Sequence, residues 1–181
     1  MAREFTYFAG TLPMLFFGEK APMTVAAFDE DAERLLDAKS AALLKSAELY
    51  CGDAEKFPPP VQKFYDWENA LRNTLLDFRK KYSPDAADYK RNNPDFYSEI
   101  APVLAQAANT PDLLEAEKLI DKLRWNALDN FGTGHYSDMT ALAFYRIRLQ
   151  ILAKYLTRTA EAGNQALENI LSNLIDSSNT N

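Results

Sequence analysis

The chain has 181 residues, of which 47% are hydrophobic and 25% charged, and its net charge at pH 7 is −6. This is globular composition, and the length allows a sizeable core in one domain or two small ones. The positive charges are scattered, which excludes a nucleic-acid binder, because such proteins cluster lysine and arginine against phosphates. No apolar run approaches the roughly 20 residues that span a bilayer, so no direct membrane insertion is expected.

The use of cysteine and the apolar start of the chain indicate a cytoplasmic protein. Cys51 is the single cysteine, which excludes an intrachain disulfide. Residues 5–17 are apolar, but Gly10 and Pro13 interrupt them and Glu4 precedes them. That pattern does not suit a secretory signal peptide.

The first 23 residues predict an irregular, aromatic-rich segment, because glycines and prolines punctuate it. We expect its aromatic side chains, Phe16 and Phe17 among them, to form an interface patch. Thr24 is a candidate cap for the first helix, and Ser40 predicts the start of a second, short one. The apolar stripe expected for the first helix is Val25, Phe28, Leu35 and Leu36.

The prolines Pro58-Pro59-Pro60 are expected to interrupt helical structure, because three prolines cannot lie inside a helix. The helix with the clearest periodicity follows them. Apolar residues recur every three or four positions from Val61 to Tyr82, which indicates one buried helical face. Ser83-Pro84 is expected to end this helix.

Two cap-then-proline pairs, Asn93-Pro94 and Thr110-Pro111, predict helices over 95–108 and 111–131. The residues expected on the buried face of the second are Leu113, Leu114, Glu117, Ile120, Leu123, Ala127 and Phe131.

The last and longest segment is predicted to begin at Ser137 or Asp138. Its apolar stripe runs from Leu142 to Ile175 and passes Gly163. A glycine inside a helix costs only about 1 kcal/mol relative to alanine. One long bent helix and two stacked helices therefore both fit the pattern.

The predicted fold is all-α, a multi-helix bundle with an irregular aromatic-rich N-terminal segment in a single domain over 1–181. Two related sub-bundles, 1–110 and 111–176, are an alternative, and 177–181 is expected to be a disordered tail. The alternative rests on Asn-Ala-Leu-x-Asn, which occurs twice, at 69–73 and 126–130, each time just after a tryptophan. Asparagine is a mediocre helix former, so these amides are expected to bond to neighbouring backbone.

No catalytic, metal or cofactor site is predicted. A zinc site needs three or four Cys and His ligands, and the chain has one of each. The histidine, His135, is expected in an exposed loop because glycines flank it. Gly132-Thr133-Gly134 lacks the Gly-Lys-Ser/Thr that a phosphate-binding loop requires, and it is explained as a helix end.

Two carboxylates, Glu68 and Glu117, fall on the apolar faces of their helices, where ionised groups are seldom left unpaired. Arg72 lies one turn after Glu68, while Lys118, or Asp121 together with Arg124, lies near Glu117. Structural ion pairs are therefore expected. The competing interpretation is acid–base catalysis by either glutamate, which requires a cavity with converging carboxylates.

Four stretches together resemble an uncharacterised bacterial family that is encoded among the subunits of V-type (A/V-type) rotary ATPases and related to their C subunit. They are Tyr7-Phe8-Ala9-Gly10-Thr11-Leu12-Pro13, Pro22-Met23-Thr24 through Phe28, Trp67-Glu68-Asn69-Ala70-Leu71-Arg72-Asn73, and Arg124-Trp125-Asn126 to Leu128 followed by Tyr136 to Leu152, which includes Tyr145-x-x-x-Leu149-Gln150-Ile151-Leu152.

This resemblance implies a fold like that of the V-type ATPase C subunit, and a non-catalytic central-stalk or assembly role without cofactors. In rotary ATPases, the C subunit seats the central shaft (the D and F subunits) on the membrane proteolipid ring. The implied partners are the D subunit of the shaft, other V-type ATPase subunits and the ring, at the periphery of the inner membrane. At 181 residues the chain is too short for the three domains of a complete C subunit.

The resemblance and the N-terminal aromatic stretch together give the candidate interaction residues, which are Trp67, Glu68, Asn69, Arg72, Asn73, Trp125, Asn126, Phe16 and Phe17. The alternative function is a free-standing helical adaptor or regulator that binds a partner helix along the 142–175 stripe.

Overall fold

The computed structural model describes residues 2–50, 54–79 and 96–157, and all regular structure within these ranges is helical, as predicted. The elements are α1 (Ala2–Thr11), α2 (Val25–Leu35), α3 (Ala38–Lys45), the 3-10 turn η1 (Ala54–Lys56), α4 (Pro59–Arg79), α5 (Ile100–Ala108), α6 (Leu113–Phe131) and α7 (Met139–Thr157). No helix within these ranges is long and apolar enough to cross a membrane.

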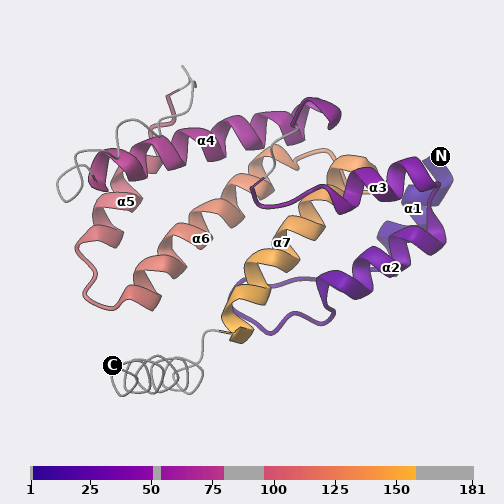
Figure 1. Cartoon of the computed structure of the whole chain (residues 1–181), viewed down its shortest axis with the longest axis horizontal. Coiled ribbons are helices and arrows are strands. Elements are labelled where there is room, and N and C mark those ends of the chain that lie inside the picture. Colours follow the sequence, from indigo (N-terminus) through magenta and orange to yellow (C-terminus); the bar gives the residue numbers. More distant parts are fainter. Residues whose placement is uncertain (1, 51–53, 80–95, 158–181) are drawn as a thin grey trace, which may run out of the picture.

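The long helices α4, α6 and α7 pack on one another, and in Figure 1 α6 and α7 cross the middle of the molecule while α4 runs along its upper edge. α5 packs on α4 and α6 at one end, whereas α1, α2 and α3 pack on α7 and on their neighbours at the other end. One hydrophobic core joins both ends, since buried residues of α4, α6 and α7 belong to the same cluster as those of the first two helices.

Aromatic side chains fill the middle of this core. Phe64 of α4 is fully buried and contacts the rings of Trp67, one turn later, and of Phe144 from α7. At the other end Phe28 of α2 stacks on Tyr145 of α7, with ring centroids 5.6 Å apart. These contacts set the positions of α4 and α7 and hence of the charged side chains between them.

The N-terminus is helical over Ala2–Thr11, so the prediction of an irregular segment over the first 23 residues was wrong for its first half. The helix forms because apolar residues recur at helical spacing and one of them, Phe8, is fully buried against Phe28. Gly10 lies in the last turn, where it costs little, and Pro13 prevents continuation.

Two predicted helix caps were displaced by aspartates. Thr24 and Asp138 cap α2 and α7 as expected, because their side-chain oxygens accept bonds from the amides three residues on. The cap of α3 is Asp37 rather than Ser40, and its carboxylate accepts from the Lys39 and Ser40 amides. Likewise Asp112, not Thr110, caps α6. A carboxylate is the stronger acceptor at a helix N-terminus, where it also favours the dipole.

The first residues of α4 and α5 also differ from those predicted. α4 begins at Pro59, because a missing N–H costs nothing in a first turn. α5 begins at Ile100, later than the predicted residue 95. Asn93-Pro94, Ser83-Pro84, Gly163 and the tail 177–181 lie outside the described residues, and so does the part of the predicted stripe that follows α7.

The buried face of α6 is rotated from the predicted one. Leu123 and Ala127 are buried as expected, but Leu113 is 78% exposed because it is the first residue of the helix. α6 buries Asp121, Arg124, Trp125 and Leu128 as well, since it packs on α4, α5 and α7 at once.

Gly132 ends α6 where the chain passes close to two neighbours. A Cβ at this position would lie 2.8 Å from the Leu128 carbonyl oxygen and 3.3 Å from the Phe144 ring. We expect Gly132→Ala to lower the free energy of unfolding by about 1–3 kcal/mol, measured by urea denaturation, because neither neighbour is a flexible chain end.

The matched control is Gly10→Ala, since Gly10 has open space around it. Replacing that helical glycine should raise stability by about 0.4–1 kcal/mol. Equal effects of the two substitutions would contradict the steric explanation for Gly132.

Candidate functional site

The centre of the molecule holds a buried group of charged side chains. Glu68 of α4 accepts two hydrogen bonds from Arg124 of α6, from Nε to Oε2 and from Nη2 to Oε1, both at 2.9 Å. Arg72, one turn further along α4, donates its Nε to Glu68 Oε1 at 3.1 Å. The predicted Glu68–Arg72 pair is therefore confirmed, but it is the weaker part of a fork-to-fork pair with another helix.

Asp121 extends this group towards α7. Its carboxylate accepts a hydrogen bond from Arg124 Nη1 at 2.8 Å, from Lys154 Nζ at 3.1 Å and from the Tyr155 hydroxyl at 2.9 Å. Arg124 thus binds two carboxylates on two helices, and Asp121 brings in a third helix. We call Glu68, Arg72, Asp121, Arg124 and Lys154 the charged brace, because together they join α4, α6 and α7.

The charged brace is desolvated, which makes its hydrogen bonds strong and their loss costly. Only 3% of the Glu68 and Asp121 side chains and 8% of the Arg124 side chain are exposed. Burial alone lowers the pKa of Arg124, but the charges and hydrogen bonds of Glu68, with Tyr50 and Asp121, raise it above its ordinary value. Arg124 therefore stays charged at every accessible pH.

The residues just before the two Asn-Ala-Leu-x-Asn copies meet at the charged brace. Glu68 lies between Trp67 and the first copy, and Arg124 precedes Trp125, which the second copy follows. Both tryptophans are buried. Trp67 donates its Nε1 to Glu99 at 3.0 Å, and Trp125 packs edge-on against Phe17. Both tryptophans therefore act in the packing of this chain on itself.

The remaining candidate interaction residues divide between packing and surface. Asn69 and Asn73 are half-buried on α4, whereas Asn126 is exposed on α6. Phe17 is half-buried between the rings of Trp125 and Tyr155. Of these nine candidates, Phe16 and Asn126 are the exposed ones, with 52% of Phe16 accessible.

Glu117 lies apart from the charged brace. Its predicted partners pair elsewhere, since Lys118 binds Glu115 and Arg124 binds Glu68 and Asp121. Glu117 is half-buried and lines a pocket.

The prediction for His135 holds in part. This residue lies in a loop, but it is only half-exposed, and its Nδ1 contacts the Asp138 carboxylate.

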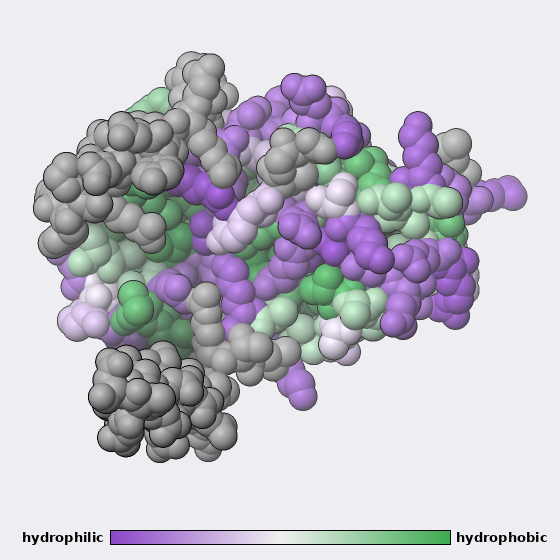
Figure 2. Space-filling model, in the orientation of Figure 1, coloured by the Kyte–Doolittle hydropathy of each residue, from purple (hydrophilic) through white to green (hydrophobic). Residues whose placement is uncertain are grey.

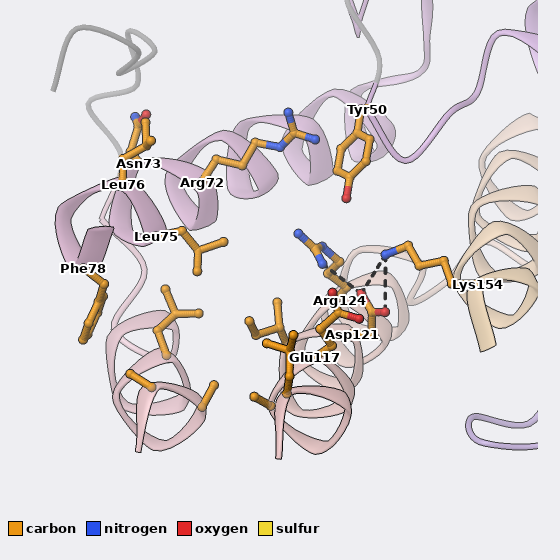
Figure 3. Close-up of a pocket in the computed structure, with 16 residues that line it drawn as sticks. Tyr50, Arg72, Asn73, Leu75, Leu76, Phe78, Glu117, Asp121, Arg124 and Lys154 are labelled. Atoms are coloured by element: carbon orange, nitrogen blue, oxygen red, sulfur yellow. Dashed lines mark hydrogen bonds and ion pairs between the residues drawn. The ribbon is translucent and has the colours of Figure 1, made fainter. Parts of the chain in front are cut away.

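The pocket, of about 620 Å³, opens where α4, α5 and α6 meet. One end is polar, as Figure 3 shows. Its side chains are Tyr50, Arg72, Asp121 and Arg124 of α6, and Lys154 of α7. At the other end Leu75 points from α4 towards apolar side chains of α5 and α6. Sequence reasoning missed this pocket, because its walls come from segments far apart in the chain.

The stripe of α7 that was proposed to bind a partner helix is occupied within the described residues. Leu142, Leu149 and Leu152 are buried by the chain's own helices, and Tyr145 is half-buried against Phe28. This part of the stripe therefore offers no groove for a partner.

Tyr145 also anchors the N-terminal loop, because its hydroxyl donates to the Pro13 carbonyl oxygen at 2.8 Å. Burial raises the pKa of Tyr145 from 10.0 to about 12. The folded state thus favours the neutral phenol. The contribution of this phenol to the free energy of unfolding is complete below pH 10 and is lost as the pH rises to about 12. We expect the urea midpoint to fall over this range.

Tyr145→Phe should make this alkaline decline shallower, because it removes one of the groups that titrate. Burial and Asp121 also raise the pKa of Tyr155, so part of the decline should remain. Tyr136→Phe is the control, since Tyr136 is 81% exposed. An unchanged slope in Tyr145→Phe would show that its hydroxyl titrates alike in the folded and unfolded chain.

The geometry of the charged brace suits stabilisation better than acid–base chemistry. A catalytic carboxylate must reach a substrate, but both oxygens of Glu68 are occupied by arginine donors. Within the described residues, no group of three or more His, Cys, Asp and Glu side chains is placed to hold a metal ion.

Comparisons with known proteins add no family to this picture. A scan against protein-family models finds no match, and neither a search of curated proteins nor one of solved structures finds a similar chain.

Proposed function

We propose that this chain is a non-catalytic helical subunit of a V-type rotary ATPase, similar to the C subunit, that acts in the central stalk or in its assembly. The observation that carries the proposal is the use of the Trp67–Asn73 stretch, one of the four stretches on which the family resemblance rests. The glutamate of this stretch, Glu68, is paired inside the molecule, where its hydrogen bonds with Arg124 join α4 to α6. A part that transmits torque or holds other subunits in place requires such internal stiffness and no turnover of its own.

The interaction surface we assign to this function is the N-terminal surface, defined as Tyr7, Met14 and Phe16. Their exposed fractions are 64%, 76% and 52%. Contiguous apolar surface in water marks protein contacts, and these three exposed side chains belong to one segment, 7–16. Tyr145 and Phe17 hold the loop that carries Met14 and Phe16, so this surface is presented on a fixed backbone.

The partners we propose are the D subunit of the shaft and neighbouring ATPase subunits, with contact to the proteolipid ring through the complex. The protein would then work on the cytoplasmic side, peripheral to the inner membrane, in an ATP-driven pump for protons or sodium ions. It would be an accessory subunit without catalysis or cofactor.

The test is affinity purification of the full-length tagged chain from its source cell under native conditions, followed by mass spectrometry. We expect the D subunit and other ATPase subunits to be recovered with it. Phe16→Asp combined with Met14→Asp should lower that recovery at least tenfold, which corresponds to about 1.4 kcal/mol or more of lost binding.

The matched control is Phe96→Asp, which places the same charge on another exposed phenylalanine, 85% accessible. It should leave recovery unchanged. Recovery of the tagged chain without any ATPase subunit, with all variants folded, would contradict the proposed function.

A further inference from the structure

The pocket between α4, α5 and α6 has an apolar wall without a covering partner among the described residues. The wall consists of Leu75, Leu76, Phe78, Leu104, Leu113 and Ile120. Leu113 is 78% exposed, and three others on α4 are only half-buried. Figure 2 shows hydrophobic residues gathered over α5 and the adjoining part of α6, on this side of the molecule.

At its polar end the pocket has one cationic side chain, Arg72, with nitrogens that donate to no described residue. The three donor nitrogens of Arg124 are all taken by Glu68 and Asp121, and Lys154 binds Asp121. Arg72 uses only its Nε on Glu68, and neither of its Nη groups donates to a described residue. Its guanidinium carbon lies 3.8 Å from the centre of the Tyr50 ring.

The charges of the lining favour an anion at this end. Three cationic side chains line the pocket against two carboxylates, Asp121 and Glu117. Asp121 is fully engaged by Arg124, Lys154 and Tyr155. Glu117 lies one turn before Asp121 on α6, and Figure 3 shows it next to Asp121, across the pocket from Arg72.

We infer that this pocket binds a single-chain amphiphile with an anionic head, of the class of long-chain carboxylates. The carboxylate pairs with the free Nη edge of Arg72 beside Tyr50, and the alkyl chain lies along the apolar wall. A volume of about 620 Å³ is within the range of small-molecule sites, which combine apolar walls with a few polar groups that orient the ligand. This binding site is separate from the N-terminal surface, and the inference does not depend on the proposed ATPase function.

The inference is tested with dodecanoate, below its micelle concentration, by isothermal titration of the full chain. We expect saturable binding at one site. Dodecyltrimethylammonium, which has the same chain and a cationic head, should bind at least tenfold more weakly, because it meets Arg72. Arg72→Gln should weaken dodecanoate binding about tenfold, whereas Arg34→Gln, which alters an exposed ion pair elsewhere, should not change it.

A second pair of variants tests the position of the alkyl chain. Ala108 lines the pocket at the end of α5, so Ala108→Phe should fill it and abolish binding. Ala101→Phe adds the same ring to an exposed position on the same helix and should leave binding intact. Circular dichroism confirms that each variant is folded.

A third arm separates a free carboxylate from a lipid headgroup, by sedimentation with vesicles of phosphatidylglycerol. Binding to dodecanoate that Ala108→Phe removes supports the inference. Binding to vesicles alone, equal binding of the anionic and cationic amphiphiles, or dodecanoate binding that survives Ala108→Phe would each overturn it.

Discussion

Arg124→Met should lower the free energy of unfolding by about 3–5 kcal/mol, a large part of the 5–15 kcal/mol typical of a domain. The substitution keeps most of the side-chain volume but removes three hydrogen bonds to two buried carboxylates. Glu68 would keep only Arg72, and Asp121 would keep Lys154 and Tyr155. Urea denaturation followed by circular dichroism measures the loss.

Arg34→Met is the control for this prediction. Arg34 pairs with Asp31 at 2.6 Å, but 71% of its side chain is exposed. Exposed ion pairs contribute about 0–1 kcal/mol, so the control should change stability by no more than that. If Arg124→Met cost no more than Arg34→Met, the buried group would not hold the helices together.

Trp67→Ala is expected to lower the free energy of unfolding by about 3–5 kcal/mol, because it removes a large, fully buried side chain from the core. Trp67 is 1% exposed and stacks on Phe64, with ring centroids 6.0 Å apart. It also donates to Glu99 at the start of α5, so the substitution loosens the wall that faces the pocket. The same denaturation experiment gives the change.

Two further variants test whether lost buried volume causes this decrease in the free energy of unfolding. Trp67→Phe keeps much of the buried volume and should cost less than half as much as Trp67→Ala. Tyr136→Ala removes an aromatic ring that is 81% exposed and should stay within about 0.5 kcal/mol of the parent chain. A small effect of Trp67→Ala would indicate that this tryptophan serves binding rather than packing.

The sequence allows the helices to be predicted wherever their apolar stripe and their ends are local features. The stripe from Val61 to Phe78 corresponds to α4, and Thr24 and Asp138 are caps that act within one turn. The sequence did not predict α1, because Gly10 and Pro13 are typical of a loop even though Phe5, Phe8 and Leu12 recur at helical spacing. What decides that helix is the burial of Phe8 against Phe28, which is a tertiary contact.

The candidate site could be predicted only in its local part. Glu68 and Arg72 are one turn apart, so their pairing follows from helix geometry. Arg124 lies 56 positions from Glu68, and nothing local distinguishes it from an exposed arginine. The packing of α6 on α4 brings Arg124 and Glu68 together. Because the buried face of α6 differs from the predicted one, Arg124 also pairs with Glu68 rather than with Glu117.

The charged brace also links the proposed ATPase role to the proposed binding pocket. It uses the Nε of Arg72 and so holds the Nη edge of that side chain in the pocket beside Tyr50. The brace therefore stiffens the bundle for the proposed role in the stalk and also fixes the binding group of the pocket.

A double-mutant cycle between Glu68→Gln and Arg124→Met tests most directly whether the buried pair joins α4 to α6. We predict a coupling free energy of about 2 kcal/mol, so the double variant should be less damaged than the two separate losses suggest. Losses that add to within about 0.5 kcal/mol would mean that the two side chains stabilise the fold independently, and would contradict the central role of this pair in joining the helices.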